Sequence, residues 1–187
     1  MALANYIKTC GKNVPGIRPQ FFVAPTETIT VLAETSEKIS TLTAAANTFM
    51  RIQADVDSVQ FTATGAFGTT GAYEQSLIAR FSRPSTELNS FVDKLTAQIG
   101  CGFEIIYIDG NAKVWLTGAS IATKEGNARP WNRLETNLDT GVLPTDQNTQ
   151  ADTITFKRMS GVRPVELDST LSGAVLAGTA AYIKWGA

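Results

Sequence analysis

The stretch STELNSFVDKLTAQIGCGFEIIYIDGNAKVWLT, residues 85–117, decides the fold class. Pro84-Ser85-Thr86-Glu87 supplies a proline and capping residues, which are signals of a helix start. Behind it, five apolar residues recur at helical spacing and form one stripe: Leu88, Phe91, Val92, Leu95 and Ile99. The pattern predicts an amphipathic helix over residues 85–99, ended by Gly100 as a left-handed cap.

An extended unit follows this helix directly. Residues 103–108 are apolar except for Glu104, a pattern typical of a strand that is buried on both faces. Asp109-Gly110-Asn111 is a turn signal, and residues 113–117 return as the second strand of a hairpin. Residues 73–81 predict a further strand before the helix. This order of strand, helix and hairpin predicts a sheet flanked by one helix.

The rest of the chain adds strands on both sides of this unit. β-Branched and aromatic side chains predict strands around residues 21–23, 28–32 and 38–43. Residues 49–63 predict one long strand pair with a bulge or tight bend, since the apolar residues change from even to odd positions at Asp57-Ser58. Residues 152–158 alternate, and residues 174–185 predict a terminal strand. We therefore expect a mainly β chain of the α+β class: a β-sandwich or barrel-like sheet with one flanking helix and long loops.

The length of 187 residues and the mass of 20.0 kDa suit one domain. Residues 1–20 are basic and broken by glycine and proline, so we expect an extended N-terminal arm. Residues 21–187 form the single β-rich domain. Residues 122–150 show no apolar period and predict a long loop with a role in function or interaction.

Composition excludes several kinds of chemistry. The chain has no histidine, which removes His-based nucleophile systems and His-ligated zinc. Cys10 and Cys101 form no CxxC pair; a disulfide stays open, and buried free thiols are favoured. No Gly-x-Ser-x-Gly elbow is present, and the glycines of residues 64–72 do not match a phosphate-binding loop. We expect no catalytic residue, cofactor or metal, and we expect that the protein is not an enzyme.

The charge of the chain favours association with other protein molecules, and its hydropathy indicates no membrane span. With 16 basic and 17 acidic residues, the net charge is −1 and only 18% of residues are charged. A nearly neutral, charge-poor surface favours association, whereas specific nucleic-acid binding needs a basic footprint. The N-terminus lacks the pattern of a signal peptide, and no apolar stretch reaches the about 18 residues of a membrane span. We expect synthesis in a cytoplasm and no membrane partner.

Two groups of residues are candidates for function. Trp131 lies between Arg129 and Arg133, a composition typical of protein contacts, and Phe67 lies in the glycine-rich loop. We predict that these four residues contact a partner. The carboxylates of Asp55, Asp57 and Glu74 are the second candidate group. We expect Asp55 and Asp57 on one strand face.

The order of strands, one amphipathic helix (Ser85 to Ile99), a hairpin (Phe103 to Thr117), a long loop and a final strand resembles bacteriophage tail tube proteins. The composition, which is rich in threonine, alanine and glycine, also looks like that of a virion structural protein. In that family a β-sandwich with a flanking helix forms hexameric rings, whose inner strands close a barrel and which stack into a tube. The resemblance implies self-association, contacts with other virion proteins, and DNA only as non-specific cargo in the lumen, lined by Asp55, Asp57 and Glu74.

Three alternatives remain open at this point. The chain could serve as a neck protein, a tail terminator or a capsid-decorating protein of a virion. A monomeric ligand-binding β-barrel is a different class, because such barrels hold their ligands behind apolar interiors without motifs. An enzyme that uses scattered carboxylates is the third, and no motif supports it.

Overall fold

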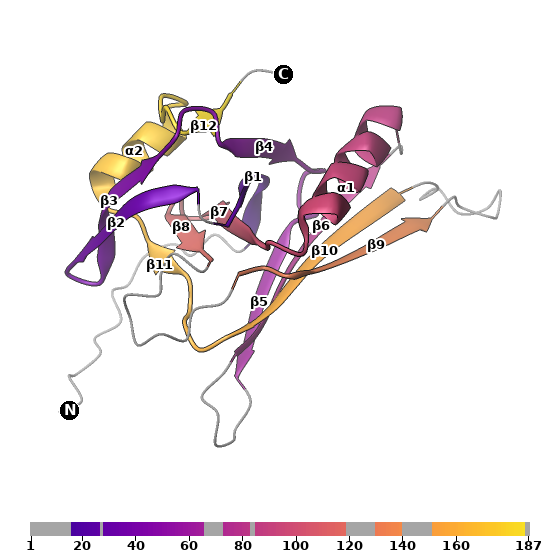
Figure 1. Ribbon diagram of the computed structural model, residues 1–187, viewed down its shortest axis with the longest axis horizontal. Helices are drawn as coiled ribbons and strands as arrows, with labels where there is room; N and C mark the ends of the chain where they lie inside the picture. The colour runs from indigo at the N-terminus through magenta and orange to yellow at the C-terminus, as the bar shows by residue number, and fades with distance from the viewer. Residues whose placement is uncertain are drawn as a thin grey trace.

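The structure, a computed structural model, describes residues 16–26, 28–65, 73–82, 85–118, 130–139 and 151–185. Within these ranges the chain is mainly β with two helices, which confirms the predicted fold class. The strands form a six-stranded sheet, a four-stranded sheet and a two-stranded hairpin (Figure 1). Strand β1 already starts at Ile17, and residues 1–15 of the expected arm lie outside the described residues.

The six-stranded sheet is the central layer, in the order β11-β8-β7-β1-β4-β12. Its neighbours pair antiparallel, except that β12 pairs with β4 in parallel. The strands are β1 (Ile17–Pro25), β4 (Phe49–Gln53), β7 (Phe103–Asp109), β8 (Val114–Thr117), β11 (Val165–Glu166) and β12 (Ile183–Lys184). Successive residues of β1 enter different apolar clusters, so the sheet is covered on both faces. This explains the largely apolar run at residues 103–108, in which Glu104 is the one charged residue.

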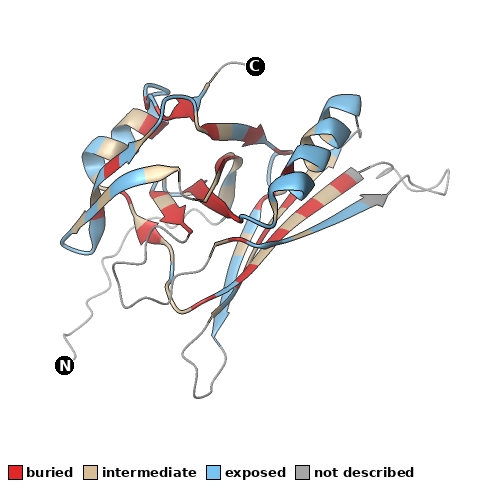
Figure 2. Cartoon of the chain, viewed as in Figure 1, coloured by how far each residue is buried: buried red, intermediate tan, exposed pale blue. Residues whose placement is uncertain are grey.

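The four-stranded sheet packs against one face of the central sheet. Its order is β5 (Gln60–Gly65), β6 (Tyr73–Ser82), β10 (Ala151–Ser160) and β9 (Arg133–Asp139), all antiparallel. Buried side chains from both sheets meet in one cluster, among them Phe21, Val23, Leu77, Ile105, Ile154 and Phe156. In Figure 2, buried and less buried residues alternate along β6 and β10, the pattern of strands with one covered face.

Helix α1 (Thr86–Gln98) completes this cluster. The Ser85 hydroxyl accepts the backbone N–H of Leu88 at 3.1 Å, so Ser85 is the N-cap among the capping residues predicted at the helix start. Leu95 is fully buried, and the other four residues of the predicted stripe pack against the cluster. The predicted cap at Gly100 is wrong: the left-handed residue is Gly102, with φ +80°, because the chain makes one further turn before entering β7.

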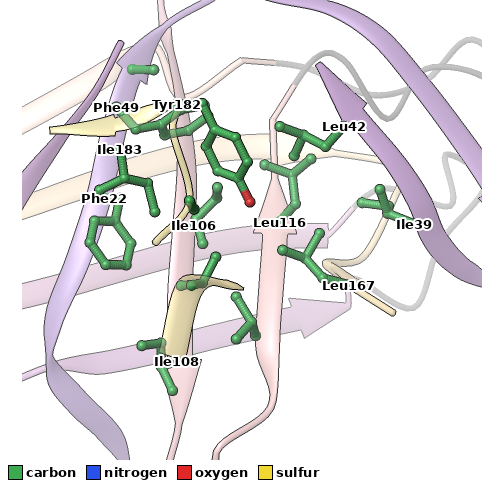
Figure 3. Packing of buried hydrophobic residues seen from close by; sticks show 14 of the residues in the cluster. Phe22, Ile39, Leu42, Phe49, Ile106, Ile108, Leu116, Leu167, Tyr182 and Ile183 are labelled. Carbon is green, nitrogen blue, oxygen red and sulfur yellow. The ribbon is translucent and has the colours of Figure 1, made fainter. Parts of the chain in front are cut away.

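The hairpin of β2 (Ile29–Thr35) and β3 (Lys38–Ala44) and helix α2 (Ser169–Leu176) cover the other face of the central sheet. Figure 3 shows this second cluster, in which Ile39 and Leu42 of the hairpin face Ile106 and Leu116 of the central sheet. In the described residues, no helix is long and apolar enough to span a membrane.

Three sequence-based predictions are corrected by these elements. Residues 169–176 form helix α2, so only β12 remains of the predicted terminal strand. Residues 49–63 are not one bent strand pair, because β4 and β5 belong to different sheets. Residues 133–139, expected in the long loop, form strand β9.

The prediction of buried free thiols is also corrected. Cys101 is an exposed free thiol, and Cys10 lies outside the described residues.

Candidate functional site

The four-stranded sheet is open at both sides. Strands β6 and β10 pair along ten residues each and form its middle, while β5 pairs with β6 alone and β9 pairs with β10 alone. Within the described part of the chain, no strand lies beside the outer side of β5 or of β9. Each outer side therefore presents a row of backbone N–H and C=O groups that are ready to pair with another strand.

The edge formed by β5 carries none of the features that usually protect a sheet edge. Its sequence, QFTATG, contains no charge and no proline, and its threonines and phenylalanine favour strands. The edge formed by β9 is polar, with Arg133 and Glu135 exposed, and Glu135 forms an ion pair with Lys157 of β10 at 2.7 Å. An uncharged edge and a charged edge thus lie at opposite sides of one sheet.

The face of the sheet turned away from the core is polar and nearly neutral. Most of its side chains are uncharged. Its described members are Gln60, Thr62, Thr64, Glu74, Ser76, Ile78, Arg80, Arg133, Glu135, Asn137, Thr153, Thr155, Lys157 and Met159. Two acidic and three basic side chains are scattered among hydroxyl and amide groups, so this face has no strongly charged patch.

The core-facing side ends in an aromatic groove beside the β5 edge. The ring of Phe61 stacks on the ring of Tyr107, with centroids 5.1 Å apart. Both residues line a shallow groove together with Trp115, whose indole N–H donates to Asp109 Oδ2 at 3.0 Å. Phe61 remains partly exposed because the apolar layer stops at this edge of the sheet.

A buried polar pair, Arg158 and Gln75, lies on the core-facing side of the four-stranded sheet. The Arg158 guanidinium, 2% exposed, donates through Nε to Gln75 Oε1 at 2.9 Å and lies 5.0 Å from the centre of the Trp131 ring. Burial lowers the pKa of Arg158 to about 10, although Glu104 and Tyr107 oppose this shift. The sequence analysis missed this pair. The alternation of side chains along β10 could have revealed it, because Arg158 falls on the same side of the strand as Ile154 and Phe156.

The structure places Trp131 in the core, so the prediction that it contacts a partner is wrong. Its side chain is 0% exposed, and its backbone exchanges two hydrogen bonds with Phe103, at 2.9 and 3.0 Å. The indole N–H donates to the Thr117 carbonyl at 3.3 Å. Arg133, two residues later, is exposed on β9 and stays a contact candidate. Phe67 and Arg129 lie outside the described residues.

The three lumen candidates separate in the structure. Glu74 is exposed on the polar face of the four-stranded sheet, as that role requires. Asp55 and Asp57 do not share a strand face, because they lie in the turn between β4 and β5, where Asp57 has φ +59°. Asp55 Oδ2 accepts the backbone N–H of Ser82 at 2.7 Å and its hydroxyl at 2.5 Å. It therefore fastens this turn to the end of β6.

The site offers pairing surfaces rather than reactive groups. Among the described residues, no three His, Cys, Asp or Glu side chains are grouped so that they could hold a metal ion. Comparisons with protein-family models, with curated proteins and with solved structures find no match for this chain.

Proposed function

We propose that this protein is a structural subunit that assembles with copies of itself, and that the four-stranded sheets of neighbouring copies join edge to edge into the wall of a tube. This is the role of a bacteriophage tail tube protein, which the order of elements along the chain resembles. In such an assembly each β5 edge pairs with the β9 edge of the next copy.

The observation that carries this proposal is the direction of the two outer strands. Each strand of the sheet is antiparallel to its neighbour, so β5 and β10 run one way while β6 and β9 run the other. When the next copy has the same orientation, its β5 is antiparallel to the β9 beside it. The joint is heterologous, because two different edges pair, and every copy can form the same joint with the next one. Such joints close into a ring when the rotation from one copy to the next divides a full turn evenly.

The distribution of mass indicates which face lines the tube. The central sheet, both described helices and the β2–β3 hairpin all lie on the core-facing side of the four-stranded sheet (Figure 1). In a closed ring this bulk has room only on the outer, wider circumference. The polar face then lines the lumen. Because this face carries few and mixed charges, it would let a polyanion such as DNA pass without holding it by phosphate contacts.

The class of a ligand-binding barrel fits the described residues less well. The space between the two sheets is filled by large buried side chains, including Phe21, Phe103, Trp131 and Phe156. The four-stranded sheet is open instead of closed on itself. A neck, terminator or decorating protein of a virion stays an alternative, which single rings or isolated copies instead of long stacks would favour.

One pair of variants tests the proposed joint. Ala63 and Thr64 are adjacent and exposed on β5, but Ala63 faces the core side and Thr64 faces the polar side. We expect Ala63→Lys to remain monomeric, because an inward-pointing charge blocks pairing at a sheet edge. Thr64→Lys adds the same charge on the open face and should assemble like the parent.

The measurement is light scattering over a range of protein concentration, followed by electron microscopy of the products. Stacked rings or tubes in the parent and in Thr64→Lys, but not in Ala63→Lys, support the proposal. A parent chain that stays a 20 kDa monomer at high concentration contradicts it. Equal assembly of both variants shows that β5 is not the joint.

A further inference from the structure

The two free edges of the four-stranded sheet are offset along the strand direction. β9 lies beside Ala151–Lys157 of β10. β5 lies beside Tyr73–Ile78 of β6, and these residues pair with residues 155–160 of β10. The two edges thus cover opposite ends of β10 and share only the levels of residues 155–157. Figure 1 shows the same offset, with β5 and β9 displaced toward opposite ends of the sheet.

The alternation of side chains restricts how β5 and β9 can meet. Phe61 and Ala63 point toward the core side on β5, and Leu134 and Thr136 have the same parity on β9. Residues that lie directly opposite each other in an antiparallel pair share a face, so core-facing residues must meet core-facing residues. The allowed registers therefore differ from one another by steps of two residues.

One of these registers pairs the whole of β5. With Ala63 opposite Thr136, all six residues Gln60–Gly65 find partners among residues 134–139 of the next copy. A shift by two residues in one direction leaves five such pairs within the two strands, and a shift in the other direction leaves four. The full register also puts the uncharged Thr62 opposite Asn137 and Thr64 opposite Glu135, so no like charges meet.

The same register produces a suitable tilt of the strands. Gly65 then lies opposite Leu134, which places Ser160 of one copy at the level of Phe156 of the next. One copy contributes four strands to the joined sheet, and each copy is therefore displaced by four residues along the strand direction relative to the next. With a rise of about 3.3 Å per residue and a strand spacing of about 4.8 Å, the tilt is about 35°. Closed barrels have tilts of about 35–45°, whereas the register with five pairs would produce about 19°.

We propose that copies of this chain pair through β5 and β9 in the register that sets Thr62 opposite Asn137, Ala63 opposite Thr136 and Thr64 opposite Glu135. The inference rests on the proposed function and adds to it the register of the joint. In this register the β9 strand of the next copy covers the edge at which Phe61 is left partly exposed, and the apolar layer continues from one copy to the next.

Disulfide trapping tests the register directly. Cys10 and Cys101 are first replaced by serine, and two cysteines are then placed on the polar face. Thr62→Cys with Asn137→Cys matches the proposed register, in which opposite Cβ atoms lie about 5 Å apart, near the range that a disulfide needs. Thr62→Cys with Glu135→Cys and Thr64→Cys with Asn137→Cys match the two neighbouring registers, where the proposed pairing leaves these positions about 7–8 Å apart.

We expect mild oxidation of the assembled protein to produce a ladder of covalent multimers from the first pair, at least fivefold more than from either control pair. A ladder from a control pair instead, with tubes still visible, overturns the register but leaves the proposed function intact. Covalent dimers from Thr62→Cys alone indicate two-fold β5–β5 pairing and overturn the joint. If the unmodified parent forms no rings or tubes, the proposed function itself fails.

Discussion

Trp131→Ala is the substitution that separates a core role from an interface role most sharply. The indole is 0% exposed, and truncation of a buried tryptophan to alanine costs about 3–5 kcal/mol. The Arg158 guanidinium, 5.0 Å from the ring centre, also loses its aromatic partner, and such a contact contributes about 2 kcal/mol when it is desolvated. We expect a loss of about 5–7 kcal/mol in the free energy of unfolding.

A loss of this size is comparable to the whole stability of a small domain, which is about 5–15 kcal/mol. The variant should therefore be largely unfolded, or should unfold at very low urea concentration. Trp131→Phe is the matched control, because it keeps a ring in the cluster and removes the hydrogen bond to the Thr117 carbonyl. We expect this control to lose about 1–3 kcal/mol and to remain folded.

The assay is urea unfolding followed by circular dichroism, at a protein concentration too low for assembly. A core role of Trp131 is contradicted if Trp131→Ala unfolds within about 1 kcal/mol of the parent and yet no longer assembles. In that case the indole would contribute to a contact between copies, and its burial against Phe103 and Phe61 would not contribute to the fold.

Two further predictions concern the backbone and the pH dependence. Gly102→Ala should lower the melting temperature strongly in thermal unfolding, because φ is +80° and the new Cβ would lie 2.5 Å from Cβ of Pro130, while Gly100→Ala, with open space around it, should be nearly neutral. Burial raises the pKa of Tyr182 from 10.0 to about 12, so the folded chain keeps a proton that the unfolded chain loses between these values. Its contribution of about 2 kcal/mol is complete below pH 10 and is lost as the pH rises toward 12; urea titrations across this window should show a smaller loss of stability in Tyr182→Phe than in the parent.

The part of the fold that was predicted correctly is the part that short-range patterns determine. The strand β6, the helix α1 and the hairpin of β7 and β8 each depend on periodicity, a cap or a turn that lies within their own residues. Helix α2 lacks such a pattern. It has small residues and Gly173 at its centre, and it is held by its Asp168 cap and by Val175, which packs into the second cluster.

Strand β9 and Trp131 show why the remaining predictions failed. The polar sequence of residues 133–139 becomes a strand because β10 offers a complete edge over seven residues, which no local pattern reveals. Two arginines beside Trp131 indicated an exposed side chain. Its direction is set instead by the pairing with Phe103, a residue 28 positions earlier in the chain, which turns the ring into the space between the sheets.

The position of the β5 edge depends on the turn after β4, which includes Asp55, a residue that the sequence analysis assigned to a different role. The turn at Asp55–Ser58 carries the chain from the central sheet to the four-stranded sheet, so β4 cannot continue as a neighbour of β5. The Asp55 carboxylate holds this turn against Ser82, and the Ser58 hydroxyl donates to the Arg80 carbonyl at 3.0 Å. Together they fasten the start of β5 to the end of β6 and leave its other side without a partner in the described chain. Asp55 therefore helps to fix the position of the edge that the proposed assembly would use, and its carboxylate forms its hydrogen bonds inside the subunit.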